Sequence, residues 1–260
     1  MELGLQGKVV VITGGATGIG KAAATSFLRE GCKVAVCTRS PEKLSKLKKE
    51  CETSGYLIFT MAADVSKASE MEALARNVVN EYGGIDIWIN NAAIYPQKML
   101  MDTSEQEWDE VMSINLKSVF LGCKAVFPHM KQQGGGVIIN ASSFASLMPS
   151  AGSGIYGATK AAINSLTRTL AAEMAPHGIR VNAYIPGVIR TDITQPVIEK
   201  NQQRLRDQVA LGRIGEPEDV AESIVFLASD AAKYMTGAFI ETSGGKFCVQ
   251  NPHFAWEIAD

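Results

Sequence analysis

The most constraining feature of the sequence is a regular alternation of short, β-branched apolar runs with longer amphipathic stretches. The apolar runs predict buried strands at residues 8–13, 33–38, 57–61, 85–89, 136–141, 179–185 and 238–242. The stretches between them predict helices at 18–30, 41–54, 66–82, 104–132 (bent near Pro128), 154–175 and 216–229. Strands that alternate with helices form βαβ units. The sequence therefore predicts an α/β fold, a doubly wound parallel seven-stranded sheet with helices on both faces.

A glycine-rich turn joins the first predicted strand to the first predicted helix, in the segment Thr13-Gly14-Gly15-Ala16-Thr17-Gly18-Ile19-Gly20. Glycines let the backbone approach a phosphate closely, and the helix N-terminus presents free N–H groups with a partial positive charge. The spacing differs from the GxGxxG of the common dinucleotide fold, and the Gly-Lys-Ser/Thr of nucleotide triphosphatases is absent. We expect a dinucleotide pyrophosphate here, bound by Gly14, Thr17, Gly18, Ile19 and Gly20.

The end of the second predicted strand, Cys37-Thr38-Arg39-Ser40, indicates which dinucleotide is bound. A carboxylate at this point would bind the ribose 2′-OH of NAD(H), whereas a basic residue would accept a 2′-phosphate. No carboxylate is present, and the planar guanidinium of Arg39 suits a phosphate. We therefore expect NADP(H), held in part by Thr38 and Arg39. NAD(H) is the alternative, because Arg39 could instead stack on the adenine of either cofactor.

Two further patterns predict acid–base chemistry. Tyr156 and Lys160 are four residues apart at the start of a predicted helix, so the phenol and the ammonium share one face. A neighbouring cation favours the phenolate, which would lower the tyrosine pKa and fit it for proton transfer. Ser142 and Ser143 follow the fifth predicted strand, at the sheet edge where ligands bind in this fold class. A hydroxyl there can donate to a substrate oxygen, although a turn residue would look the same.

Composition excludes other classes of function. The formal net charge is −2 and no basic stripe is present, so we expect no nucleic-acid partner. We find no apolar run of about 20 residues and no signal-peptide pattern, which favours a cytoplasmic protein with no membrane partner. The 5 cysteines lack CxxC spacing and only 3 histidines occur, so we expect neither a disulfide framework nor a metal site.

Together these motifs resemble those of the short-chain dehydrogenase/reductase family, over residues 5–246 or so. The family's TGxxxGxG loop matches Thr13–Gly20, and its Tyr-x3-Lys pair matches Tyr156 and Lys160. Further family motifs match Asp64-Val65, Asn90-Asn91-Ala92-Ala93, Asn115, Ser143, Pro186-Gly187-Val188-Ile189-Arg190-Thr191, Arg213–Glu218 and Phe226–Asp230. Two departures are Ala93, where the family has Gly, and Ser243-Gly244-Gly245, where it often has Asp-Gly-Gly.

The resemblance implies a role for each matched residue. Ser143 would polarise the substrate oxygen, Tyr156 would exchange a proton with it, and Lys160 would lower the Tyr156 pKa and bind the nicotinamide ribose. Asn115 would hold a water that relays protons toward Lys160. The cofactor would also contact Tyr156 itself, together with Asp64, Val65, Asn91, Ala92, Pro186, Gly187, Ile189 and Thr191. The implied activity is hydride transfer between a nicotinamide and a carbonyl or secondary alcohol.

Substrate choice and assembly are less well determined by the sequence. Ile94, Phe144 and Ile155 flank the motifs and could line an apolar substrate pocket, or could be ordinary packing residues. We expect residues 1–260 to form a single domain, with a substrate lid at about 191–212 and a tail at 247–260. The tail could dock loosely, contact a neighbouring subunit or border the pocket. By analogy with the family we expect a homotetramer, with the helices at about 104–132 and 154–175 at its interfaces.

Two other classes of function remain open at this point. The first is a dinucleotide-binding redox sensor without turnover, although a sensor need not keep all of Asn115, Ser143, Tyr156 and Lys160. The second is a non-redox relative, such as an epimerase or dehydratase, that uses the same Tyr-Lys pair. Such relatives usually have a separate substrate domain, for which a chain of 260 residues has no room.

Overall fold

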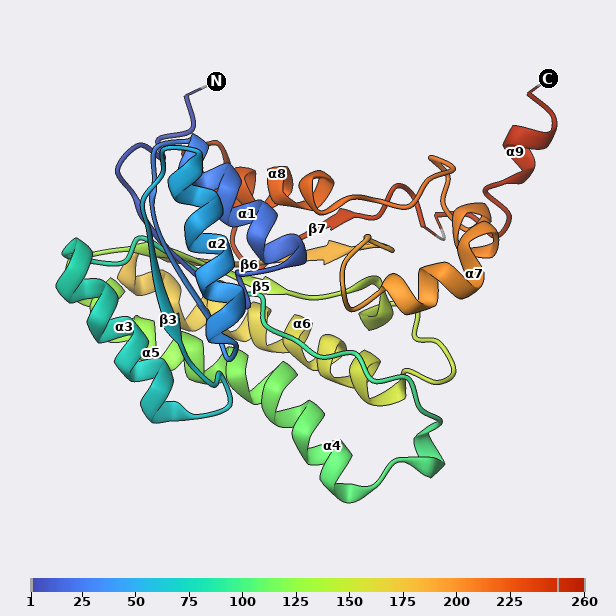
Figure 1. Cartoon of the computed structure of the whole chain (residues 1–260), viewed down its shortest axis with the longest axis horizontal. Helices are drawn as coiled ribbons and strands as arrows, with labels where there is room; N and C mark the ends of the chain where they lie inside the picture. The colour runs from blue at the N-terminus through green and yellow to red at the C-terminus, as the bar shows by residue number, and fades with distance from the viewer. Residues whose placement is uncertain (1, 247, 260) are drawn as a thin grey trace.

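A central parallel sheet organises the molecule. The computed structural model describes residues 2–246 and 248–259. Within them the strands follow the order β3-β2-β1-β4-β5-β6-β7, and every neighbouring pair is parallel (Figure 1). The strands are β1 (Val9–Thr13), β2 (Lys33–Thr38), β3 (Ile58–Ala62), β4 (Ile87–Asn90), β5 (Gly136–Ala141), β6 (Ile179–Pro186) and β7 (Phe239–Thr242). The predicted Rossmann-like, seven-stranded doubly wound sheet is confirmed.

Helices cover both faces of the sheet, as expected. The main ones are α1 (Gly18–Arg29), α2 (Pro41–Thr53), α3 (Ala68–Tyr82), α4 (Glu105–Val111), α5 (Ser118–Gln133), α6 (Gly154–Met174), α7 (Gln195–Asp207) and α8 (Pro217–Ala228). In Figure 1, α1 and α8 lie on one side of the sheet, and α3, α5 and α6 lie on the other. The strand order reverses direction between β1 and β4, and this is the point where ligands bind in doubly wound sheets.

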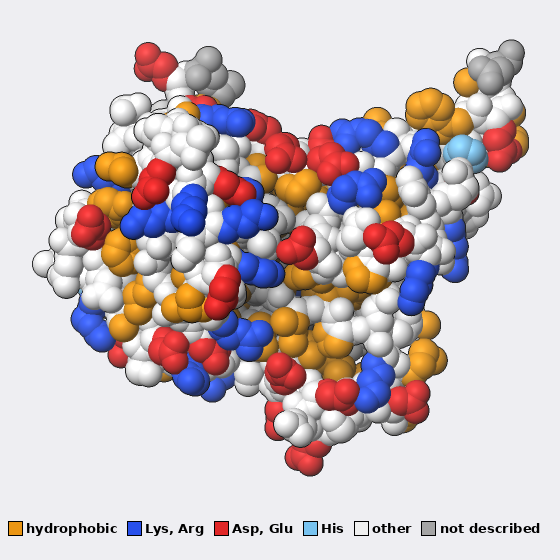
Figure 2. Space-filling view, in the orientation of Figure 1, with side chains coloured by type: hydrophobic (Ala, Val, Ile, Leu, Met, Phe, Trp, Pro, Cys, Tyr) orange, Lys and Arg blue, Asp and Glu red, His pale blue; other side chains and the backbone are white. Residues whose placement is uncertain are grey.

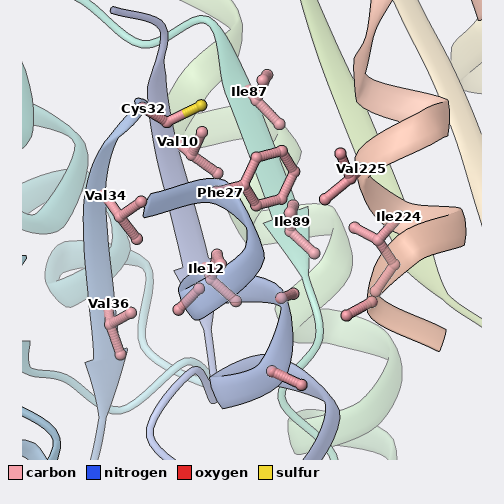
Figure 3. Packing of buried hydrophobic residues seen from close by; sticks show 14 of the residues in the cluster. Val10, Ile12, Phe27, Cys32, Val34, Val36, Ile87, Ile89, Ile224 and Val225 are labelled. Carbon is pink, nitrogen blue, oxygen red and sulfur yellow. The ribbon is translucent and has the colours of Figure 1, made fainter. Parts of the chain in front are cut away.

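Each face of the sheet has its own apolar core. On the α1 and α8 side, Phe27 is fully buried among side chains of β1, β2, β4 and α8, including Val10, Ile89 and Val225 (Figure 3). On the other side, Trp88 of β4 and Met71 of α3 belong to a second buried cluster, to which α5 and α6 also contribute. Every residue of β1 from Val9 to Thr13 is buried, because helices cover both faces of the sheet. A strand in this position has a continuous apolar sequence instead of an alternating one.

The long helix predicted at 104–132 is not regular. Residues Met112–Lys117 form a π-helical turn between α4 and α5, and α5 continues past Pro128 to Gln133. The interruption thus comes well before the expected bend near Pro128. A π-helical turn changes the backbone hydrogen-bond pattern and is frequent at functional sites. Here it contains the buried Asn115, whose side chain bonds the backbone of another segment.

The same stretch also combines helical length with an apolar composition. Glu105–Gln133 is long and apolar enough to span a membrane by length and composition, but 56% of its most apolar window is buried inside the protein. A run of apolar residues of this kind is typical of a core helix that packs on a sheet, and α5 contacts β4 and β5.

The stretch at 191–212, expected to be a substrate lid, contains the helix α7. Pro196 lies in its first turn, and Gln195–Glu199 and Gln203–Asp207 side-chain bonds support it at i, i+4 spacing. Asn201 has non-helical dihedral angles, so the helix is kinked there. The strongly polar composition of this surface helix, in which Ile198 is the only buried residue among those described, concealed it in the sequence.

The described part of the tail ends in a short helix, α9 (Phe254–Glu257), that projects beyond α7 in Figure 1. Residues 247 and 260 of the tail lie outside the described residues. The indole Nε1 of Trp256 donates a 2.9 Å hydrogen bond to the carbonyl of Ala210, next to α7. The aromatic side chains remain largely exposed, at 58% for Phe254 and 54% for Trp256. The tail is therefore attached to the expected lid segment by the Trp256 hydrogen bond and by His253, whose Nδ1 lies 3.7 Å from a carboxylate oxygen of Asp207.

Candidate active site

A cavity of about 370 Å³ opens at the carboxyl ends of the strands. In Figure 2 the surface is hollowed between the side that carries α1 and α2 and the side that carries α7. The cavity lining includes every residue expected to bind the cofactor: Gly14, Thr17, Gly18, Ile19, Gly20, Thr38, Arg39, Asp64, Val65, Asn91, Ala92, Tyr156, Lys160, Pro186, Gly187, Ile189 and Thr191. Ser143 lines it as well. Segments distant in sequence thus meet in one space, as the topology predicts.

The glycine-rich turn is shaped as an open cradle. Gly14 and Gly18 have φ angles of +64° and +53°, which side chains rarely tolerate. The Gly14 N–H donates to the carbonyl of Cys37 in β2, which ties the turn to the sheet. Thr17, the N-cap of α1, makes no side-chain capping bond, so the N–H groups of the first turn are not capped by it. A cradle of this form, at a helix N-terminus without an acidic first turn, fits a pyrophosphate.

Within the glycine-rich turn, Gly20 is the position where an added Cβ atom would come closest to its neighbours. A Cβ atom there would lie 2.5 Å from the Gly14 carbonyl oxygen and 2.6 Å from Asn91 Nδ2. We expect Gly20→Ala to weaken dinucleotide binding at least ~10-fold, because the turn must move to relieve the overlap. Isothermal titration calorimetry would measure the dinucleotide Kd of the variant. Gly83→Ala is the matched control: its φ is +88° but its Cβ meets no atom, so it should cost stability without changing affinity. Unchanged affinity in Gly20→Ala would contradict the cradle.

Two basic side chains line the end of the cavity beside β2. Arg39 follows the strand, and Lys43 lies in the first turn of α2, whose N-cap Ser40 accepts a bond from the Lys43 N–H. Lys43 was not expected from the sequence, although its position one turn after Arg39 could have indicated it. Lys43 Nζ lies 3.7 Å from a carboxylate oxygen of Asp192, in the segment that begins the expected lid. Both side chains are exposed, so this ion pair is weak and can be exchanged for a ligand phosphate.

The hydroxyl groups and the amine at the other end of the cavity are close together. Lys160 is buried, and its Nζ donates a 2.7 Å bond to the Ala141 carbonyl at the end of β5. The same amine lies 5.5 Å from the ring centroid of Tyr156, as expected for residues one helical turn apart. Ser143 is the N-cap of the short helix Phe144–Ser146, and its hydroxyl accepts a hydrogen bond from the Ala145 N–H. The Ser143 and Tyr156 hydroxyl groups are also hydrogen-bonded to each other. This arrangement can deliver a proton to, or take one from, an oxygen placed beside Tyr156.

The pKa of Tyr156 shifts in the opposite direction from the one expected. Burial raises the pKa of Tyr156 to about 12, and only the hydrogen bond from Ser143 acts to lower it. Burial also lowers the pKa of Lys160 to about 7. A low-dielectric site disfavours the charged form of both groups, so the ammonium that would favour the phenolate is itself destabilised. In the protein alone, Tyr156 is therefore a protonated acid throughout the neutral range.

This pKa leads to a directional pH prediction. Below about 12 the phenol is protonated, so carbonyl reduction has its acid at every working pH, and between pH 6 and 9 its kcat/KM should fall only as far as loss of the proton from Lys160, whose pKa is about 7, lowers it. Alcohol oxidation needs the phenolate, whose fraction grows about tenfold per pH unit below the pKa, so its kcat/KM should rise steadily. Initial rates measured across this pH range for both reduction and oxidation give the two kcat/KM profiles. A reduction kcat/KM that falls near pH 7, together with an oxidation kcat/KM that stops rising at the same pH, would show that the Tyr156 pKa is lowered in the working enzyme, as the sequence suggested.

The remaining expected residues are Asn115 and the three candidates for the substrate pocket. The Asn115 amide is fully buried, with its oxygen accepting from the Ile94 N–H and its nitrogen donating to the Ile94 carbonyl. It thereby holds the Ile94 backbone at the cavity wall, and the proton relay stays a prediction. Of the substrate-pocket candidates, Ile94 lines the cavity, whereas Phe144 and Ile155 do not appear in its lining. Ile155 is buried in packing, and the Phe144 ring lies against the Lys246 amine at 4.8 Å from its centroid.

Comparison with known proteins supports this geometry. Residues 14–246 match a family described as enoyl-(acyl carrier protein) reductase. The 3-oxoacyl-[acyl-carrier-protein] reductase FabG of Thermotoga maritima is 40% identical over 241 residues, covering 93% of this chain and 98% of that protein. The protein of the same name from Staphylococcus epidermidis is 39% identical, covering 92% and 99%. The chain belongs to the short-chain dehydrogenase/reductase family.

A solved structure agrees with this assignment. A short-chain type dehydrogenase/reductase from Mycobacterium marinum superimposes with a TM-score of 0.91 at 34% identity, covering 95% of this chain and 98% of the other. The family and its relatives identify the protein as an NAD(P)-dependent oxidoreductase that acts on a C=O or CH–OH group of a small-molecule substrate. A nicotinamide dinucleotide is its cofactor, and the cradle described above fits it.

Proposed function

We propose that this protein reduces a ketone, using NADPH in preference to NADH. The observation that carries the proposal is one continuous cavity with Arg39 and Lys43 at one end and Ser143, Tyr156 and Lys160 at the other. Two cations beside β2 favour a cofactor that carries a 2′-phosphate. The protonated Tyr156 favours the reductive direction near neutral pH. The names of the 3-oxoacyl-[acyl-carrier-protein] reductases that it resembles make a 3-oxoacyl thioester the first substrate to test.

The mechanism assigns one task to each side chain. The bound dinucleotide supplies or accepts the hydride. Ser143 donates a hydrogen bond to the substrate oxygen and holds it beside Tyr156. The Tyr156 Oη donates its proton to that oxygen as an alkoxide forms, and takes the proton back in the reverse direction. Lys160, fixed on the Ala141 carbonyl, holds a proton near the phenol and can bind the nicotinamide ribose. The segment Pro186–Thr191 would orient the nicotinamide.

A substrate and cofactor panel tests the proposal. Loss of absorbance at the nicotinamide band would be followed with NADPH and NADH in turn, against an acetoacetyl thioester, simple ketones, aldehydes, sugars and a keto-steroid. We expect turnover of at least one ketone, with kcat/KM for NADPH at least ~10-fold above NADH. Binding of both cofactors without turnover of any substrate would favour the redox sensor instead. Product formation without net change in cofactor absorbance would favour the non-redox relative.

We also propose that the protein is a cytoplasmic homotetramer. The exposed face of the α4 and α5 stretch carries Trp108 and Phe120, which are 40% and 49% exposed, and large apolar side chains in such a position suit an interface. All 5 cysteines, which belong to the described residues, are free, and this suits a reducing compartment. Light scattering on a size-exclusion column should give a mass near four times 27.9 kDa. A monomeric mass would contradict the assembly.

A further inference from the structure

Tyr184 reaches across the sheet to a residue two strands away. It lies in β6, in register with Ala141 of β5, and is only 1% exposed. Its hydroxyl donates a 2.8 Å hydrogen bond to Oδ1 of Asn91, which directly follows β4. Strand β5 separates β4 from β6, and Ala141 presents only a methyl group at that point. The phenol therefore links two segments that the backbone ladder does not join.

The Asn91 amide passes this link on to the phosphate-binding turn. Its Nδ2 donates to the carbonyls of Thr13 and Gly14, at 3.0 and 3.1 Å. Two carbonyl partners require the nitrogen on that side, so the oxygen must face Tyr184 and needs a donor there. The hydroxyl of Tyr184 supplies that donor. The Thr13 hydroxyl completes the arrangement by accepting from the N–H groups of Asn91 and Ala92.

This amide occupies a position with little freedom. A Cβ at Gly20 would come within 2.6 Å of Asn91 Nδ2, so the amide packs directly against the first turn of α1. Tyr184 and Asn91 both line the cavity, between the phosphate-binding turn and the reacting hydroxyls. Rotation of the amide would release the Gly14 carbonyl and place an oxygen against the carbonyls of Thr13 and Gly14, which is electrostatically unfavourable.

We propose that Tyr184 is a positioning residue for dinucleotide binding, whose hydroxyl fixes the Asn91 amide and, through it, the Gly14 turn. The proposal rests on the proposed function, because it requires that a dinucleotide occupies this cavity. Burial, together with the nearby Tyr156, raises the pKa of Tyr184, so its hydroxyl keeps its proton and stays a donor at every working pH. An aliphatic residue could fill the same volume but could not orient the amide.

Calorimetric titration of NADPH and NADH into the native protein and Tyr184→Phe tests the proposal directly. Loss of the hydroxyl leaves the half-buried Asn91 oxygen without its protein donor, and we expect the Kd of the preferred dinucleotide to rise about 3- to 10-fold. The matched control is Tyr82→Phe at the end of α3, whose hydroxyl bonds the Phe59 backbone away from the cavity. That variant should lose comparable thermal stability with an unchanged Kd.

A double-mutant cycle separates positioning from a merely structural role. If Tyr184 acts through Asn91, then Asn91→Ala and the Asn91→Ala/Tyr184→Phe double variant should bind the dinucleotide equally. The double variant removes both partners and leaves neither unpaired, so even if Tyr184→Phe alone does not fold, a Kd of the double variant that differs from that of Asn91→Ala would overturn the proposal. Additive losses, or an unchanged Kd in Tyr184→Phe, would overturn the proposal while leaving the proposed function intact. Failure of the native protein to bind either dinucleotide would overturn both.

Discussion

Replacement of Tyr156 by Phe should lower kcat for carbonyl reduction by about 10³-fold. The variant keeps the ring that lies 5.5 Å from Lys160 Nζ and 4.7 Å from the ring centroid of Tyr95, and loses only the hydroxyl. The cavity shape and the phosphate-binding turn stay the same, so the Kd of the dinucleotide should change less than about threefold. Steady-state rates and calorimetry on the same preparation give both numbers.

The large loss of kcat expected for Tyr156→Phe follows from the proton that the Tyr156 hydroxyl donates to the substrate oxygen. Without the phenol, the alkoxide must take its proton from water or from Ser143, neither of which is held as a matched acid. Tyr234→Phe provides the control, because Tyr234 is fully exposed and far from the cavity lining. Turnover of Tyr156→Phe within tenfold of the native rate would reject Tyr156 as the proton donor. Lost dinucleotide binding would instead show that the hydroxyl serves mainly to bind the cofactor.

Replacement of Arg39 by Ala should raise the KM for NADPH about 10- to 100-fold and leave the KM for NADH nearly unchanged. The guanidinium lies at the exposed end of the cavity, where a 2′-phosphate would accept charge-assisted hydrogen bonds from it. Removing it leaves Lys43 as the neighbouring cation, and Lys43 can keep only part of the phosphate affinity because it acts as a point charge. The NADPH preference should also weaken with added salt in the native protein.

The comparison of the two cofactors distinguishes a phosphate ligand from a stacking residue. If Arg39 only stacks on the adenine, Arg39→Ala should weaken NADPH and NADH equally. Arg76→Ala on α3 is a suitable control, because Arg76 is exposed and pairs only with Glu72 on its own helix among the ion pairs of the described residues. An equal loss for both cofactors would contradict the proposed NADPH preference and would restore NAD(H) as an equal alternative.

The local features of this protein were predictable because they depend on residues close together in the sequence. Alternating apolar runs encode the strands, and their order with the helices encodes a parallel sheet. The spacing of Gly14, Gly18 and Gly20 encodes a turn that only glycine permits, and the i, i+4 spacing encodes the Tyr156–Lys160 pair. Boundaries fell within a few residues of those observed, for example Gly18–Arg29 against 18–30. The edge of the sheet where these motifs meet followed from topology alone.

Tertiary structure decided what depends on burial and on contacts between distant segments. The pKa of Tyr156 is raised because the site is desolvated, and no local pattern reports how deeply a helix face is buried. Phe144 and Ile155 flank the catalytic motifs in sequence, yet neither is in the cavity lining. Tyr184 and Asn91, which are 93 positions apart, meet only because β4, β5 and β6 are adjacent in the sheet. Sequence periodicity indicates which face of an element is buried, whereas folding determines what that face contacts.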